Sequence, residues 1–216
     1  MNLQGKIINV LGDSITQGVG VSCVENAYQN VMGRIVGAAE VRNFGISGTR
    51  LARQYGADNF PWPFTERFKD MPDDADLVII FGGTNDYGHG DAPFGKLGDT
   101  DRGTYCGAVR WLMNKLTEMY PNSKIVFMTP ARRLGDEKPS QSLHRYYPSL
   151  LLRDYVDVII ETAKDFDIHV LDLYTQLGID PNGEEDRVKY TAEGLHFNDA
   201  GHRVIAQRLK EFLETI

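Results

Sequence analysis

Short apolar runs alternate along the chain with longer segments in which apolar residues recur at helical spacing. The runs are compact and rich in Val, Ile and Phe, which is typical of strands that are covered on both faces. Their alternation with helical segments predicts a parallel sheet. The predicted strands are Lys6–Leu11, Glu40–Phe44, Asp76–Phe81, Lys124–Thr129 and His169–Leu173.

Four longer segments are predicted as helices. In the last of them, apolar residues including Ile205, Leu209 and Phe212 recur on one helical face. Five strands with four or more helices indicate an α/β protein built as a three-layer αβα sandwich. A length of 216 residues without a linker or repeat favours a single domain over residues 1–216. The predicted helices are Ala27–Ala38, Thr104–Met119, Leu150–Phe166 and Asp199–Thr215.

Two segments do not fit the alternation of strands and helices. Asp86–Arg102 is rich in glycine, and Ala131–Pro148 contains paired arginines and paired tyrosines. Both follow predicted strands directly. Because ligands of open parallel sheets bind outside the carboxyl ends of the strands, we expect these two loops to form walls of a site.

The overall charge narrows the class of partner. The chain has 23 basic and 30 acidic side chains, for a formal net charge of −7. This charge repels phosphate-rich partners, so it argues against nucleic acid and anionic membranes and favours a small-molecule substrate. The apolar run Ile7–Leu11 is too short for a signal peptide or a membrane span, which predicts a cytoplasmic protein. Cys23 and Cys106 are predicted to be free thiols, and no feature indicates an oligomeric state.

Candidate chemistry begins at Ser14, which follows Gly12 and Asp13 at the end of the first predicted strand. A serine in this place exposes its hydroxyl, as a nucleophile requires. A serine after a strand is as often a helix N-cap, whose side chain accepts a backbone hydrogen bond. The motif alone therefore leaves both interpretations open.

Three further elements bear on that choice. Residues 43–48 (Asn-Phe-Gly-Ile-Ser-Gly) follow the second strand, and their glycines leave backbone N–H groups free to face a ligand. Asn85 follows the third strand and places an amide at a strand end. Glu193 and His196 precede the last helix, and their side chains can hydrogen-bond only if the backbone turns at Gly194.

Together these elements resemble the four blocks of the SGNH hydrolases, also called GDSL-type esterases and lipases. They occur in the family's order and span Gly12 to His202, which is nearly the whole chain. The resemblance implies a flavodoxin-like sandwich with strand order 2-1-3-4-5. It also implies an acyl-ester hydrolase, and no cofactor is predicted.

The resemblance assigns roles to residues that follow three of the strands. Ser14 matches the nucleophile, and its backbone N–H matches one donor of the oxyanion hole. Gly48 matches the second donor, with Gly45 as the less favoured candidate, and the side chain of Asn85 matches the third. Such donors stabilise the charge that develops on the carbonyl oxygen, each by on the order of 3 kcal/mol.

His196 matches the base of the family. A serine hydroxyl is a poor nucleophile at neutral pH, and an imidazole can take its proton. Glu193 stands where the family usually has Asp, and its side chain is one methylene longer. Glu193 is therefore the predicted triad acid, while a main-chain carbonyl, Asp199 or Asp186 are the alternatives that the sequence leaves open.

The other histidines are expected to have no direct part in the chemistry. His202 and His169 are predicted to be structural, and His89 and His144 are expected to be solvated in the long loops. No histidines stand four residues apart on a helix and no HExxH occurs, so no metal is predicted. The chain also lacks GxxxxGK[ST], GxGxxG and GxSxG, which argues against nucleotide binding and the α/β-hydrolase fold.

Three groups of loop residues each allow two interpretations. The aromatic cluster 60–64 either lines the site or covers the core, and its prolines predict a rigid loop. Arg132 and Arg133 either bind an acidic group of a substrate or are solvated. The roles of Tyr146 and Tyr147 are left open in the same way.

The sequence thus favours a serine hydrolase that cleaves small carboxylic esters, with carbohydrate O-acetyl esters as the leading substrates. Short-chain lipid esters, aryl esters and thioesters are rival substrates, and acyl transfer to an alcohol is a rival reaction. A different class of function is a non-catalytic ligand-binding domain in which Glu193 marks a decayed triad.

Overall fold

Five parallel strands form the centre of the molecule in the computed structural model, which describes residues 1–54, 62–139 and 149–216. The order across the sheet is β2-β1-β3-β4-β5, and every neighbouring pair is parallel. The three-layer α/β architecture and the strand order 2-1-3-4-5 are therefore confirmed. The strands are β1 (Ile7–Gly12), β2 (Glu40–Gly45), β3 (Leu77–Phe81), β4 (Lys124–Met128) and β5 (His169–Leu171).

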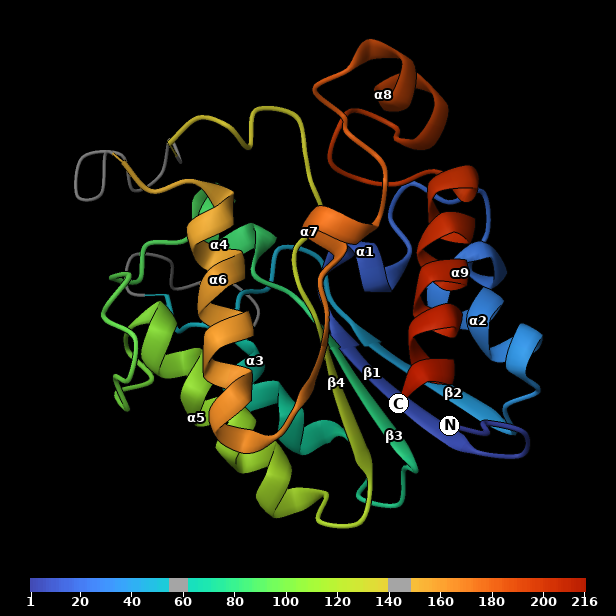
Figure 1. Cartoon of the computed structure of the whole chain (residues 1–216), viewed down its shortest axis with the longest axis horizontal. Coiled ribbons are helices and arrows are strands. Elements are labelled where there is room, and N and C mark those ends of the chain that lie inside the picture. Colours follow the sequence, from blue (N-terminus) through green and yellow to red (C-terminus); the bar gives the residue numbers. More distant parts are fainter. Residues whose placement is uncertain (55–61, 140–148) are drawn as a thin grey trace.

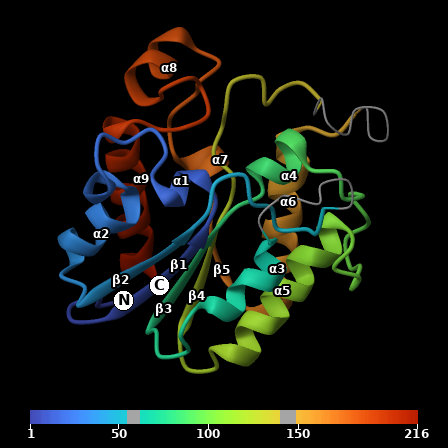
Figure 2. The same cartoon turned by 180° about the vertical axis from the view of Figure 1, so that it is seen from behind.

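Helices cover both faces of this sheet (Figures 1 and 2). Alternate residues of a strand point to opposite faces, so β3 sends Ile79 into one core and Ile80 into the other. The first core lies under α2 (Tyr28–Val36) and α9 (Asp199–Thr215). The second core lies under three helices, namely α3 (Phe64–Arg67), α5 (Tyr105–Met119) and α6 (Leu152–Ala163).

The long helices lie where the apolar periodicity predicts them, whereas the short helices do not follow from the sequence. The bounds of α9 agree with the prediction, and β5 ends two residues early because Asp172 caps the helix that follows it. A helix of one turn is too short to carry a periodic pattern. Besides α3, the short helices are α1 (Ser14–Gln17), α4 (Thr84–His89), α7 (Leu173–Gln176) and α8 (Glu184–Tyr190), and the 3-10 turns are η1 (Val24–Asn26), η2 (Phe68–Asp70) and η3 (Lys164–Phe166).

The carboxyl ends of the strands gather at one edge of the sheet. Helices α1, α4 and α7 follow β1, β3 and β5 and lie together at this edge, which is the upper one in Figure 1. Buried Arg67 joins two of the strand ends, because its guanidinium donates to the carbonyl of Gly12 at 3.3 Å and to the carbonyl of Phe44. Among the described residues, no helix is long and apolar enough to cross a membrane.

Candidate active site

Ser14 is the first residue of α1 and stands directly at the end of β1. The cap of this helix is Asp13, whose carboxylate accepts the N–H of Ile15 at 3.0 Å. The capping role that the sequence left open for Ser14 thus belongs to its neighbour. Ser14 is only 5% exposed, and its Oγ lies 2.9 Å from Nε2 of His196.

Glu193 lies on the opposite side of the imidazole. One of its carboxylate oxygens, Oε1, hydrogen-bonds Nδ1 of His196 and also accepts the backbone N–H of His196 at 3.2 Å. The structure therefore brings Ser14, His196 and Glu193 into one hydrogen-bonded row. The longer glutamate side chain still reaches the ring, because the local backbone folds back on itself.

A tight turn between Thr191 and Phe197 produces that geometry. These two residues form an antiparallel bridge, and the N–H of Ala192 donates to the carbonyl of His196 at 2.8 Å. Gly194 has a φ of 92°, a left-handed conformation that side chains other than glycine rarely adopt. The turn that the sequence requires at Gly194 is thus present.

The alternative acids for His196 are engaged elsewhere. The carboxylate of Asp199 accepts the N–H and hydroxyl of Ser22 at 2.8 and 2.6 Å and the amide of Asn26 at 3.0 Å. Asp186 accepts the N–H of Asp180 at 2.8 Å. Neither carboxylate hydrogen-bonds His196, so the geometry favours Glu193.

The loop after β2 is anchored next to Ser14. The N–H of Ile46 donates to the carbonyl of Gly12 at 3.1 Å. Gly48 has a φ of 75°, and within residues 1–54, 62–139 and 149–216 no acceptor binds its N–H. Gly45, by contrast, donates its N–H to Oδ1 of Asn43 at 2.8 Å.

Gly45 is needed for packing instead. A Cβ at this position would lie 2.2 Å from the backbone nitrogen of Gln17, because the end of β2 presses against α1. This close approach explains why position 45 is a glycine. Gly48 is then the glycine whose N–H can face a ligand.

The side chain of Asn85 is held at both ends, on one side through a hydrogen-bonded pair of His89 and Arg50 that the sequence analysis missed. Its Nδ2 donates to the carbonyl of Thr49 at 3.0 Å, and its Oδ1 lies 3.0 Å from Nε2 of His89. Nδ1 of His89 contacts the guanidinium of Arg50. Since arginine only donates, Nδ1 is the acceptor and Nε2–H donates to Asn85, which directs Oδ1 to His89 and leaves the second Nδ2 hydrogen for a ligand.

The expectation that His89 is merely solvated is therefore wrong. Partial burial and the nearby charges of Arg50 and Arg133 lower the pKa of His89 to about 4, so the ring is neutral at physiological pH. Asn85 and His89 stand four residues apart on α4, and this spacing was the signal available in the sequence.

Two buried carboxyl groups lie behind the site. Burial and the charge of Asp86 raise the pKa of Asp13 to about 7. Burial raises the pKa of Asp86 to about 6, although Asp86 accepts the N–H groups of Leu51 and Ala52 at 2.9 and 3.0 Å. Asp13 caps α1 and Asp86 holds the N–H groups of residues 51 and 52, so both carboxyl groups brace backbone next to the site.

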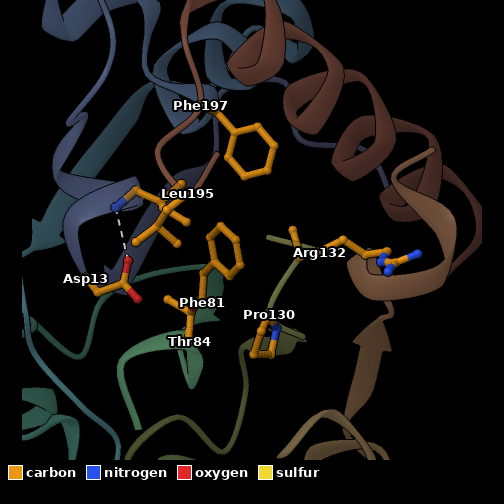
Figure 3. A pocket seen from close by; sticks show the side chains of 10 residues that line it. Asp13, Phe81, Thr84, Pro130, Arg132, Leu195 and Phe197 are labelled. Carbon is orange, nitrogen blue, oxygen red and sulfur yellow. Dashed lines mark hydrogen bonds between the residues drawn. The ribbon is translucent and has the colours of Figure 1, made fainter. Parts of the chain in front are cut away.

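Figure 3 shows a narrow crevice that is lined by Asp13 and Leu195, the sequence neighbours of Ser14 and His196. Asp13 and Thr84 lie on one side of it, with Leu195 and Phe197 on the other. The crevice leaves no room for a water molecule. The turn that carries His196 is therefore packed closely against the ends of β1 and β3.

The remaining histidines that the structure describes are structural, as predicted. His202 is fully buried, and its Nδ1 accepts the N–H of Tyr28 at 3.0 Å. Nε2 of His169 lies 3.2 Å from Nζ of Lys124, at the start of β5 and away from the site. His144 lies outside the described residues.

The loop candidates divide between core and surface. Phe64 is fully buried in the core under α3, α5 and α6, whereas Trp62 is 72% exposed. The other aromatic candidates, Phe60, Tyr146 and Tyr147, lie outside the described residues. Cys23 and Cys106 are both free thiols, as predicted.

The described segments contain no group of three or more His, Cys, Asp or Glu side chains that could hold a metal ion. What the site can do follows from its row of hydrogen bonds. It holds a hydroxyl next to an imidazole, with a carboxylate behind the imidazole and N–H donors near the hydroxyl. This is an arrangement for nucleophilic attack on a carbonyl group.

Comparisons with known proteins agree with this chemistry. The profile of the GDSL-like lipase/acylhydrolase family matches residues 10–204. A crystal structure of a Lactobacillus plantarum protein is 31% identical to the chain with a TM-score of 0.84, and the alignment covers 98% of both chains. No protein with a curated description matches the sequence.

Two more distant structures share the fold. A possible lipase from Chitinophaga pinensis DSM 2588 is 21% identical with a TM-score of 0.73, over 97% of this chain and 98% of that one. The salicylyl-acyltransferase of a tetracycline biosynthetic pathway is 18% identical with a TM-score of 0.70, over 98% of this chain and 55% of that one.

Proposed function

Since the chain belongs to the GDSL-like lipase/acylhydrolase family, we propose that it is a serine ester hydrolase with Ser14 as its nucleophile and His196 as its base. The observation that supports this proposal is the 2.9 Å contact between Oγ of Ser14 and Nε2 of His196. A base must be within about 3 Å of the hydroxyl to take its proton during attack.

The proposed reaction begins when Nε2 of His196 takes the proton of Ser14 and Oγ attacks the ester carbonyl. Glu193 holds Nδ1–H and stabilises the imidazolium that forms. The carbonyl oxygen becomes an oxyanion, which receives hydrogen bonds from the N–H groups of Ser14 and Gly48 and from Nδ2 of Asn85.

The ester bond then breaks and the alcohol leaves with the proton from His196, so that the acyl group remains on Oγ of Ser14. A water molecule next gives its proton to His196 and attacks the acyl carbonyl. Collapse of this second intermediate releases the carboxylic acid and returns the proton to Ser14.

The proposed substrates are small carboxylic esters, with carbohydrate O-acetyl esters as the leading class. A cavity of about 360 Å³ is lined by Leu134, whose N–H donates to the carbonyl of Gly194 in the turn that carries His196. Its walls include Tyr87, Arg133 and Lys138, side chains that suit a polar alcohol better than a long acyl chain.

Hydrolysis of a p-nitrophenyl ester series tests the function. We expect turnover with a preference for acetate over octanoate, and a fall of about 10⁴-fold or more in kcat for Ser14→Ala. A serine-directed phosphonate should label the wild-type chain at Ser14 and leave Ser14→Ala unlabelled. A folded chain that neither turns over any ester nor reacts with the phosphonate is instead a ligand-binding domain, and the proposal is then wrong.

Acyl transfer is distinguished by its products. With a sugar acceptor added, a hydrolase releases the free acid, whereas a transferase yields the acylated sugar from the same acyl-enzyme. We expect the free acid to predominate.

A further inference from the structure

Two adjacent arginines after β4 have opposite surroundings. The guanidinium of Arg132 forms ion pairs with Asp136 at 3.0 Å, Glu137 at 2.6 Å and Asp180 at 2.9 Å. Arg133 forms no ion pair with a carboxylate of the described residues. The two arginines thus differ, because Arg132 is paired directly with carboxylates, whereas Asp136, Glu193 and Asp13 act on Arg133 only from a distance.

The guanidinium of Arg133 is held in place by uncharged groups. Its Nη1 lies 3.4 Å from the carbonyl and 3.3 Å from the hydroxyl of Thr84, and its Cζ lies 5.7 Å from the centre of the Tyr87 ring. Neutral groups that fix a charged fork reduce the entropy that it loses when it binds an anion.

This guanidinium lines the cavity of about 360 Å³ beside the site. Thr84, which contacts it, immediately precedes Asn85, and Leu134 donates its N–H to the carbonyl of Gly194 at 2.8 Å. The cavity therefore lies between α4, which carries the proposed oxyanion donor, and the segment 133–139, which is hydrogen-bonded to the turn that carries Glu193 and His196.

A second cation lies on the wall of the same cavity. Lys138 lines it, and the hydroxyl of Tyr87 donates to the backbone carbonyl of Lys138 at 2.7 Å. This bond fixes the backbone that carries the lysine. Among the described residues, Lys138 forms no ion pair with a carboxylate either.

We propose that the cavity is a subsite for a carboxylate on the ester substrate, which Arg133 binds through its guanidinium fork and Lys138 attracts from the rim. This inference rests on the proposed function and narrows its substrates to esters that carry a carboxylate close to the bond that is cleaved. A guanidinium matches a carboxylate with two parallel hydrogen bonds, and partial burial strengthens that interaction. A neutral ester would leave this guanidinium without a directly paired carboxylate, since Asp136, Glu193 and Asp13 act on it only from a distance.

Matched pairs of esters test whether the substrate carboxylate belongs to the alcohol part or to the acyl part. In the first pair, 4-acetoxybenzoate is compared with 4-acetoxybenzamide, so that only the charge of the alcohol part differs. In the second pair, mono-4-nitrophenyl adipate is compared with 4-nitrophenyl hexanoate, so that the charge lies on the acyl part. The quantity measured is the ratio of kcat/KM between the anionic and the neutral member.

We expect Arg133→Gln to lower this ratio by about tenfold or more in one of the two pairs, since a hydrogen bond to a charged group has that effect when it is lost. Arg133→Lys should keep part of the ratio, because it retains the charge without the fork. Arg132→Gln is the matched control and should keep the wild-type ratio, with circular dichroism used to establish that each variant is folded.

If the ratio of kcat/KM stays unchanged in both pairs for Arg133→Gln, the subsite proposal is wrong. It is also wrong if Arg132→Gln lowers the ratio equally. In either case, hydrolysis of the neutral esters still supports the proposed function. Calorimetry decides the subsite without turnover, with 4-hydroxybenzoate and 4-hydroxybenzamide as probes of the alcohol side and the monoamide of adipate and hexanamide as probes of the acyl side. Arg133→Gln should weaken the binding of one anionic probe about tenfold or more relative to its neutral partner. Equal effects on both members of each probe pair overturn the subsite, even if no ester is cleaved.

Discussion

The two halves of the site differ in how the protein holds them. Ser14 and Asn85 are buried at the ends of β1 and β3, with 5% and 4% exposure. Glu193 stands on a surface turn, where its side chain is 51% exposed and that of His196 is 23% exposed. The sheet thus fixes the nucleophile and the proposed oxyanion donors, whereas one glycine-dependent turn presents the base and its carboxylate.

This difference in burial indicates which hydrogen bonds should contribute most to catalysis. A bond in a buried, water-poor place is strong and its loss is costly, whereas water screens a charge on the surface. We therefore expect substitutions in the buried half to lower activity more than removal of the charge on Glu193. The predictions below test this ranking.

After Ser14→Ala, the largest effect is expected for Asn85→Ala. Removal of one oxyanion donor should lower kcat on 4-nitrophenyl acetate by about 10²- to 10³-fold. KM should change little, because the lost hydrogen bond acts on the transition state. A rise in KM at unchanged kcat would assign Asn85 to substrate binding instead.

Glu193→Gln should have a smaller effect on kcat, of about 10- to 100-fold, compared with about 10⁴-fold for a buried acid of a serine protease triad. The reason is the screening of an exposed carboxylate by water. Asp199→Asn provides the control, because that carboxylate is bound by Ser22 and Asn26. A larger fall for Glu193→Gln than for Asn85→Ala would reverse the ranking of the two halves.

His89→Ala should lower kcat by about tenfold, since it removes the hydrogen bond that orients the amide of Asn85. The effect should vanish in the Asn85→Ala background, because both residues act through the same amide. Steady-state kinetics of the two single variants and the double variant measure this coupling. Additive losses would show that His89 acts independently of Asn85.

The smallest effect concerns stability rather than rate. Because the pKa of Asp13 is raised from 3.8 to about 7 in the folded chain, the folded state holds a proton that the unfolded state releases. The resulting stabilisation is fully present below the unfolded pKa and is lost as the pH rises through about 7. Between about pH 5 and about pH 8, the melting temperature of the wild-type chain should fall more than that of Asp13→Asn, by about 5 °C.

Scanning calorimetry at the two pH values checks this stability prediction. Asn at position 13 can still accept the N–H of Ile15, so the cap is preserved. Asp73→Asn changes an exposed carboxylate and should retain the wild-type pH dependence. If Asp13→Asn also retains it, Asp13 does not hold the proton.

Much of the fold and the identity of the candidate residues could be predicted from the sequence. The buried strands are continuous apolar runs, and α9 has a clear helical period, so neighbours along the chain are enough to define them. Ser14, Asn85 and His196 were identified because each stands beside a recognisable strand or helix boundary. The short helices, including α1 and α4, could not be predicted, since one turn has no period.

Apolar periodicity and glycine turns are properties of adjacent residues, so they were enough to predict the parallel sheet and the set of residues at its carboxyl edge. The pairing of those residues became apparent only in the folded chain. Arg132 is neutralised by Asp180, 48 positions away, while Arg133 faces a cavity, and Ser14 meets His196 across 182 positions. Burial, charge pairing and screening depend on which distant segments the sheet topology brings together, and the local sequence does not record these contacts.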